Sequence, residues 1–239
     1  MSTPTTMKAV VIQGPKQVDH SGPIPKYDFV LGHEFVSEVY ETGDSIKNWR
    51  KGDKAATALN LIMLLMANIF PTSYFVANNA YTMLNEAKQK DTITVMIRCD
   101  PVGLCAITAA CSFFKMVYTI DSVPECLAEV KKHGAIPLHL TNNDPVKTVK
   151  EATEGCGTDI ALEVVGAGLN LYNKNLYFQF GCCPVQAVFD PAIKLLSKHH
   201  DLFRSFIQHT QPIEDALEYY KLFNQHKVLK TIFEMNHAN

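Results

Sequence analysis

The sequence predicts an α/β protein in which a β-rich N-terminal part precedes a doubly wound parallel sheet. Two observations support this prediction. Between residues 91 and 165, apolar segments typical of strands alternate with segments typical of helices, and strands joined in this way form parallel sheets with helices on both faces. Before residue 60, short strand-like segments are separated by Gly-Pro and Gly-Asp pairs that favour turns.

The elements expected in the first third of the chain are short strands followed by helices. Residues 7–12 are expected to form a strand and residues 18–28 a loop rich in Pro and Gly, with short strands between the turns that follow. From residue 59, apolar side chains recur every three or four positions, which predicts helices near 59–69 and 73–84.

The alternation that follows has well-marked helix boundaries. Strands are expected at 91–97, 117–121, 135–140 and 159–165, and helices at 101–114, 124–133 and 145–154. A proline begins each helix, where its fixed φ and missing N–H are tolerated. Beyond residue 168 the expected elements are a strand at 176–180, a helix that begins at Asp190-Pro191, a helix at 213–224 and a strand at 230–235.

Composition limits the classes of partner. Of the 239 residues, 47% are hydrophobic and 19% charged, which is ordinary for a globular protein. A formal net charge of −2, without a basic run, gives no electrostatic case for a nucleic acid or an anionic membrane as partner. The longest apolar run, near 59–66, is well short of the ~20 residues that cross a bilayer, so a buried helix is expected there.

The cysteines and the N-terminus predict a cytoplasmic protein. No charged flank followed by a long apolar stretch occurs at the N-terminus, so no secretory signal peptide is expected. The seven cysteines are odd in number and lack paired C-x-x-C spacing, which argues against a disulfide framework. A reducing compartment fits this pattern.

The turn between the strand at 91–97 and the following helix has the form of a dinucleotide-binding fingerprint. In the intact form, G-x-G-x-x-G, the glycines allow a tight turn, a close diphosphate and helix–strand packing. Here only the last glycine is present, as Gly103, while Arg98 and Asp100 occupy the first two places. Two unit charges ~4 Å apart at a dielectric near 20 repel by about 4 kcal/mol, so Asp100 would oppose a diphosphate. Arg98 could offset part of this repulsion by pairing with the phosphate or with Asp100.

Six residues are predicted to contact the cofactor: Pro101, Val102, Gly103, Leu104, Asp121 and Ser122. The first four begin the helix whose N-terminus would face the phosphates. Asp121 ends the next strand, about 20 residues beyond the turn, where an acid accepts the ribose hydroxyls of NAD. This favours NAD over NADP. The alternative is a turn that binds weakly or not at all, with Asp121 as an ordinary strand-end aspartate.

Several short motifs follow one another along the chain: MKAVV at 7–11, LGHEF at 31–35, GD at 43–44, GDK at 52–54, NIFPT at 68–72, PVGL at 101–104, IDS at 120–122 and DIALEVVG at 159–166. In this order they resemble the zinc-type medium-chain alcohol dehydrogenase family, in particular a branch near formaldehyde and threonine dehydrogenases. The resemblance covers nearly the whole chain. It implies a partly open β-barrel of GroES-like fold beside a Rossmann domain, both shortened here.

The resemblance also implies a domain division. Residues 1–60 would form the truncated GroES-like part, residues 61–210 the shortened Rossmann domain, and residues 211–239 a helix and strand that pack back on the N-terminal part. Members of the family are longer, and stretches before Pro25 and after Gly166 look missing here.

The resemblance makes His33 and Glu34 the metal-site candidates, because the histidine of the family's G-H-E motif binds zinc. A catalytic zinc takes three protein ligands and an open position. No cysteine precedes Cys99, so the family's upstream ligand is missing, and the neutral amide of Asn68 stands where the family has an aspartate. The sequence therefore predicts a vestigial metal site without zinc, and it assigns no catalytic residue.

The predicted function is that of a NAD-dependent oxidoreductase of the alcohol dehydrogenase type, acting on a small alcohol or aldehyde, with NAD binding weak or lost and activity in doubt. The first alternative is an inactive family member that binds a nucleotide weakly or binds a partner protein. The second is a poorly folding remnant, because a sheet that has lost strands exposes hydrogen-bonding edges.

Overall fold

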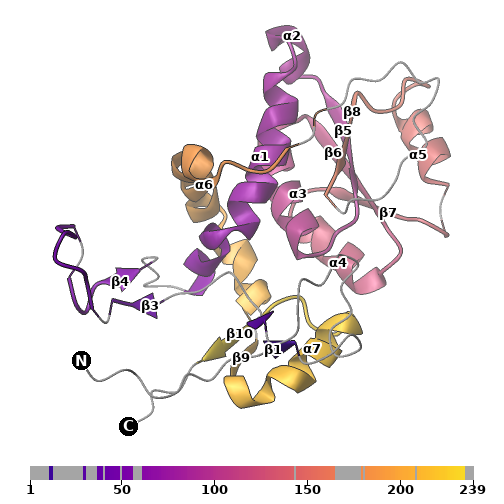
Figure 1. Ribbon diagram of the computed structural model, residues 1–239. Coiled ribbons are helices and arrows are strands. Elements are labelled where there is room, and N and C mark those ends of the chain that lie inside the picture. Colours follow the sequence, from indigo (N-terminus) through magenta and orange to yellow (C-terminus); the bar gives the residue numbers. More distant parts are fainter. Residues whose placement is uncertain are drawn as a thin grey trace. The chain divides into compact units, whose positions relative to one another are not determined.

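The computed structural model describes residues 11–12, 29–30, 37–39, 41–48, 50–55, 61–142, 144–164, 179, 181–207 and 209–234 (Figure 1). Residue contacts divide the chain into two compact units. One consists of Met1–Leu64 with Arg204–Asn239, and the other of Leu65–Phe203. The domain boundaries expected near residues 60 and 210 stay predictions.

The unit Leu65–Phe203 is built on a four-stranded parallel sheet with the strand order β7-β6-β5-β8. The strands are β5 (Ile93–Ile97), β6 (Met116–Asp121), β7 (Ile136–His139) and β8 (Ile160–Glu163). Because β5 pairs with both β6 and β8, the strand order reverses between β5 and β8. In open α/β sheets, ligands bind outside the carboxyl ends of the strands at such a reversal. The predicted α/β class with a parallel sheet is confirmed.

Helices cover both faces of this sheet, as predicted (Figure 1). The connections from β5 through β6 to β7 run one way across the sheet, and the connection from β7 to β8 returns. Right-handed crossovers therefore place α3 (Pro101–Phe113) and α4 (Pro124–Lys132) on one face and α5 (Pro145–Ala152) on the other. Val149 of α5 packs in a buried cluster with Tyr118 of β6 and Leu138 of β7.

Helix α1 (Ile69–Thr82) packs along α3, where small side chains let the two backbones approach. Ala77 of α1 and Ala106, Ala109 and Ala110 of α3 are buried without exposed area. The hydroxyl of Ser73 lies 2.9 Å from the carbonyl oxygen of Val102 and so ties α1 to the first turn of α3.

The predicted break between two helices near residues 70–72 is wrong. A 3-10 helix, η1 (Leu61–Ala67), is followed at Asn68 by α1, which includes Pro71. Proline at this point breaks no hydrogen bond, because the first turn of a helix has no intrahelical partner for its N–H groups.

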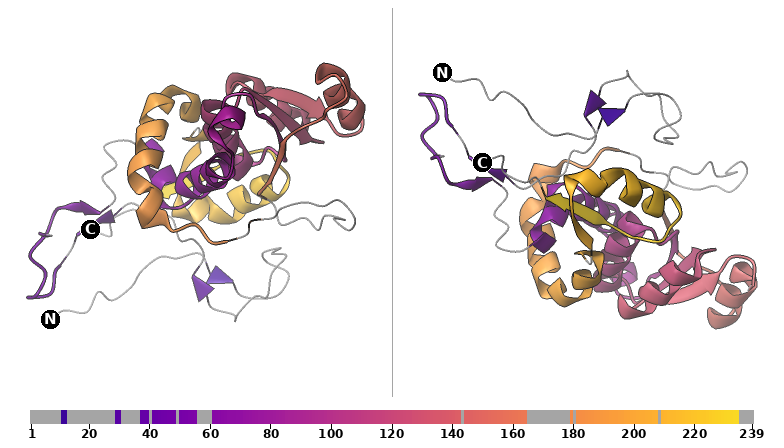
Figure 2. Two further views of the ribbon diagram at one scale, coloured as in Figure 1. Left: turned by 90° about the horizontal axis from the view of Figure 1, so that it is seen from above. Right: turned by 90° about the horizontal axis from the view of Figure 1, so that it is seen from below.

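The helix expected to begin at Asp190-Pro191 begins earlier, as α6 (Val185–Lys198), with Pro191 inside it. Buried Val188, Ala192 and Leu196 recur every four residues on both sides of the proline, so one apolar face holds the helix together. Pro191 has no N–H to donate to the carbonyl of Ala187, four residues earlier. Ala187 is exposed, so water can bond to this carbonyl instead. Helix α6 lies beside α1 in Figure 1 and both views of Figure 2.

In the other unit, β9 (His209–Pro212) pairs in parallel with β10 (Thr231–Glu234). The two strands are connected by η3 (Ile213–Asp215) and α7 (Ala216–Asn224). The C-terminal helix and strand are confirmed. Strand β9 was not predicted, because its sequence HTQP is polar and does not alternate. Among the described residues, this unit also has two antiparallel pairs, β1 (Val11–Ile12) with β2 (Phe29–Val30) and β3 (Ser37–Glu38) with β4 (Lys54–Ala55). Most of the strand expected at 176–180 falls outside the described residues.

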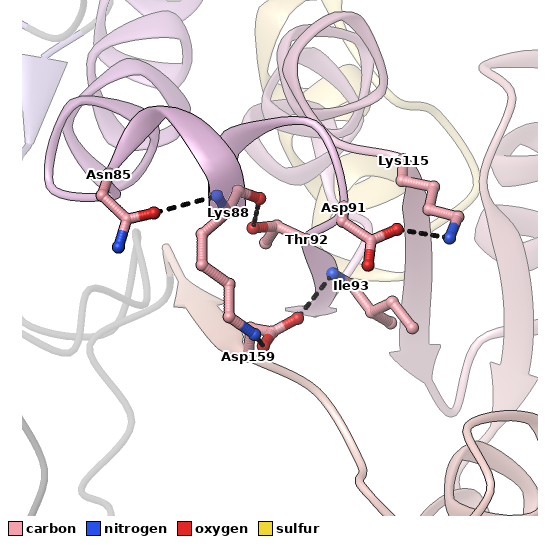
Figure 3. A network of polar contacts seen from close by, with 7 residues as sticks. All are labelled: Asn85, Lys88, Asp91, Thr92, Ile93, Lys115 and Asp159. Atoms are coloured by element: carbon pink, nitrogen blue, oxygen red, sulfur yellow. Dashed lines mark hydrogen bonds and ion pairs between the residues drawn. The ribbon is translucent and has the colours of Figure 1, made fainter.

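A polar network at the amino ends of the strands joins β5 to β8 (Figure 3). Asp159 accepts the backbone N–H of Ile93 at 2.9 Å and the ammonium group of Lys88 at 3.0 Å. Lys88 belongs to α2 (Glu86–Gln89), which Asn85 caps through the N–H of Lys88. The hydrogen bond from Ile93 is the main reason that the pKa of Asp159 lies below its ordinary value, and the Lys88 pairing adds to it.

Removing the carboxylate of Asp159 is expected to weaken the pairing of β5 with β8. Because Asp159 is partly exposed, Asp159→Ala should lower the free energy of unfolding by only about 1 kcal/mol in urea titrations at neutral pH. The contribution is present above the unfolded pKa of about 3.9 and is lost as the pH falls. Lys88→Ala, which leaves the backbone bond intact, serves as the control and should change little. Equal losses in the two variants would contradict this account.

Candidate functional site

The turn Arg98–Asp100 leaves β5 at the carboxyl edge of the sheet, where the strand order reverses. Arg98 adopts φ 75°, in the left-handed region. A non-glycine residue pays about 1–2 kcal/mol there, and a glycine enters it without strain. The N–H of Arg98 donates to the carbonyl of Ile120 at 2.9 Å, so the turn extends the pairing of β5 with β6. Arg98 thus adopts the left-handed backbone conformation that a glycine at the first position of the fingerprint would adopt without strain.

Gly103 lies so close to this turn that no side chain fits. A Cβ atom at residue 103 would lie 2.5 Å from the carbonyl oxygen of Arg98. This contact is the close helix–strand approach that the last glycine of the fingerprint permits. The geometry of a dinucleotide turn is therefore kept at this position.

Asp100 is the N-cap of α3. Its carboxylate accepts the backbone N–H of Gly103 at 2.8 Å, and its backbone carbonyl accepts the N–H of Leu104 at the same distance. Pro101 follows at the first helical position and has no N–H to offer. A helix N-terminus attracts anions through its free N–H groups and dipole. Here a carboxylate of the chain itself takes that place.

Asp121, at the end of β6, is bonded to the same turn. One carboxylate oxygen accepts the N–H of Cys99 at 2.8 Å and contacts its thiol sulfur at 3.4 Å. The other accepts the N–H groups of Ser122 at 2.6 Å and Val123 at 3.0 Å. Burial acts to raise the pKa of Asp121, but these hydrogen bonds outweigh it and hold the pKa below its ordinary value. The carboxylate is therefore charged at neutral pH.

Cys99 was not among the predicted site residues. It is fully buried, and its thiol pKa is raised by a hydrogen bond with Cys126, by burial and by the charge of Asp121. The thiol is thus protonated and able to donate. Its position inside the fingerprint was visible in the sequence, but its contact with a residue 22 positions away was not.

The structure brings the six predicted cofactor residues to one edge of the sheet. Pro101 and Val102 are half-buried, while Gly103 and Leu104 are buried in the start of α3. Ser122 is exposed beside Asp121. Leu104 has no exposed area, so its side chain belongs to the core. Contact of these six residues with NAD stays a prediction.

The metal-site candidates His33 and Glu34 lie outside the described residues. Asn68, which stands in place of an acid ligand, accepts a hydrogen bond from the hydroxyl of Thr72 at 3.1 Å. In the described part of the chain, no group of three or more His, Cys, Asp or Glu side chains is arranged to hold a metal ion.

Comparison with known proteins identifies the family. The family model for the alcohol dehydrogenase GroES-like domain matches residues 6–68, and the model for zinc-binding dehydrogenases matches residues 101–219. The medium chain reductase/dehydrogenase ucsI of an Acremonium species is 30% identical, with 70% of this chain and 88% of that protein covered. The chain belongs to the zinc-type medium-chain alcohol dehydrogenase family. The predicted family is confirmed, together with a GroES-like N-terminal part and a shortened Rossmann domain.

Other proteins similar to this chain are also alcohol dehydrogenases. Zinc-type alcohol dehydrogenase B of Aspergillus flavus is 28% identical over 98% of this chain and 82% of its own length. Among solved structures, the alcohol dehydrogenase TADH from Thermus sp. ATN1 is similar in fold, with a TM-score of 0.73, 22% identity and coverage of 90% of this chain and 88% of that one. None of the helices in the described residues has both the length and the apolar character needed to span a membrane.

Proposed function

We propose that this family member is a NAD-dependent oxidoreductase of the alcohol dehydrogenase type whose cofactor site is weakened and which holds no firmly bound zinc. The observation that carries this proposal is the hydrogen bond from Gly103 to the carboxylate of Asp100. A diphosphate that approaches the start of α3 meets this negative charge, and it gains the N–H of Gly103 only by displacing the carboxylate. NAD binding weaker than at an intact glycine fingerprint follows.

NAD, when bound, would supply the acceptor for hydride from an alcohol, or NADH the hydride for an aldehyde or ketone. The chain contributes the parts that position it. Gly103 lets the start of α3 pack closely against the turn, and Asp121 lies at the strand end where a ribose is expected. Asp121 and Ser122 would therefore contact the adenosine half, and Pro101 and Val102 the phosphates.

The residues present do not fit a catalytic zinc. Asn68 offers a neutral amide whose oxygen is already bonded to Thr72, and the sequence has no cysteine before Cys99. A zinc site of the family needs three protein ligands. We therefore assign no step of the reaction to a metal.

Metal analysis of the purified protein tests this part of the proposal. We expect less than one zinc per chain after gel filtration without chelator, and no change on His33→Ala, because a single histidine is too weak a site. Asn68→Asp, which replaces the amide by an acid, is the matched variant that should bind more. One tightly held equivalent in the natural protein, lost on His33→Ala, would contradict the proposal.

The second candidate function is that of an inactive nucleotide-binding or partner-binding protein. It is favoured by one further observation, which is that donors of the chain itself occupy both carboxylate oxygens of Asp121. Alcohol-dependent reduction of NAD separates the two candidates. Turnover supports the enzyme, while NADH binding without turnover supports the inactive form. A partner that co-purifies from cells with the inactive form would identify it as a partner-binding protein.

A further inference from the structure

The carboxylate of Asp121 is saturated by donors of its own chain. A carboxylate has about four acceptor directions. The N–H and the thiol of Cys99 occupy one oxygen, and the N–H groups of Ser122 and Val123 occupy the other. A ribose hydroxyl can therefore bond to Asp121 only by replacing one of these four donors.

The four donors are not equally easy to replace. Three are backbone N–H groups whose positions are set by the turn and by the end of β6, at 2.6, 2.8 and 3.0 Å. The fourth is the thiol of Cys99, a weak donor at 3.4 Å whose single proton can be directed to Cys126 instead of Asp121. Displacing the thiol leaves the backbone of the site intact.

The burial of the two residues fits such an exchange. Cys99 has no exposed area, whereas Asp121 keeps 7% of its surface exposed. Of the two residues, only Asp121 has surface that a ligand can touch. The thiol of Cys99 also has a hydrogen bond with Cys126 of α4.

We infer that Cys99 is a positioning residue that holds the carboxylate of Asp121 in the ligand-free protein and that gives way when a ribose hydroxyl binds. The inference rests on the proposed nucleotide binding. It makes the side chain at position 99 a determinant of affinity for the ribose diol, although this side chain touches no part of the ligand.

The order of affinities in a Cys99 series tests the inference. Cys99→Ala removes the competing donor and should tighten 5′-AMP binding, whereas Cys99→Ser supplies a stronger donor and should weaken it. Each change should be roughly two- to tenfold, because a thiol is a weak donor even to a charged carboxylate. Binding is measured by displacement of NADH in the natural protein and in the Asp100→Gly background.

The control probe is 2′,3′-dideoxy-AMP, which has the same base and phosphate but no ribose hydroxyls. Its affinity should not depend on residue 99, because the exchange requires a hydroxyl. Cys111→Ala, which removes a thiol of α3 and not of the turn, is the control variant and should change neither affinity. A purely structural role of Cys99 would shift both probes together and so overturns the inference.

The remaining outcomes separate this inference from the proposed function. Nucleotide binding that is absent from every variant, Asp100→Gly included, overturns both. Binding that is present but the same across the series, or weaker in Cys99→Ala, overturns the exchange alone. The Ala variant suffices for this decision if the Ser variant does not fold.

Discussion

Asp100→Gly is expected to tighten NADH binding by at least tenfold and by up to about a thousandfold, the limit set by about 4 kcal/mol of charge repulsion. The substitution removes the carboxylate and frees the N–H of Gly103, to which Asp100 now bonds at 2.8 Å. It also restores the second glycine of the fingerprint. A glycine cap costs the helix only a few tenths of a kcal/mol, so α3 should stay folded. Fluorescence titration with NADH measures the change.

Asp100→Asn is the matched control for this prediction. Its amide oxygen can still accept the N–H of Gly103, but the negative charge is gone. An affinity between those of the natural protein and Asp100→Gly would show that charge and capping both oppose the diphosphate. No gain in Asp100→Gly, or a loss, would show that Asp100 does not limit cofactor binding.

Acid should destabilise this protein through His133, a buried residue of the α4 C-terminus. Its ring nitrogen Nδ1 lies 2.7 Å from the hydroxyl of Thr108. Burial is the main reason that its pKa is lowered to about 4, against a smaller raising effect of Glu129 and with small lowering effects of His199 and Lys132. The folded protein therefore keeps the ring neutral down to a pH at which the unfolded chain is protonated.

The direction in which stability changes with pH follows from the pKa values of His133 in the folded and unfolded protein. Stability from the neutral ring is complete above the unfolded pKa of about 6.5 and is lost as the pH falls toward about 4. Between pH 7.5 and about pH 5 the free energy of unfolding should drop by about 2 kcal/mol from this group. Urea unfolding curves at the two pH values measure the drop.

Two variants make this prediction specific. His133→Gln should lose most of this pH dependence, because its side chain does not titrate, while His226→Gln, at an exposed position, should keep it. A pH dependence that is the same in the natural protein and in His133→Gln would assign the acid sensitivity to other groups.

The unit Leu65–Phe203 was largely predictable because its elements begin and end at local sequence signals. The starts of α3, α4 and α5 follow from Pro101, Pro124 and Pro145, and Asp144 before Pro145 caps α5 through the N–H of Lys147. Asp100-Pro101 has the same pattern as Asp144-Pro145. The sequence thus contained the information that Asp100 caps α3, although the fingerprint drew attention only to its charge.

The features that could not be predicted depend on contacts between distant residues. Pro191 looked like a helix start, but buried side chains before and after it stabilise α6 as one continuous helix. Strand β9 exists because β10 pairs with it, not because of its own polar sequence. The hydrogen bond between Cys99 and Asp121 likewise depends on the fold, which brings the two strand ends together.

The central claim is that this family member keeps the strand–turn–helix geometry of a dinucleotide site but binds the cofactor only weakly. One measurement tests it most directly: NADH titration of the natural protein, with alcohol oxidation assayed on the same sample. The account predicts weak binding and little or no oxidation. Tight binding, with robust oxidation that His33→Ala abolishes, would contradict it.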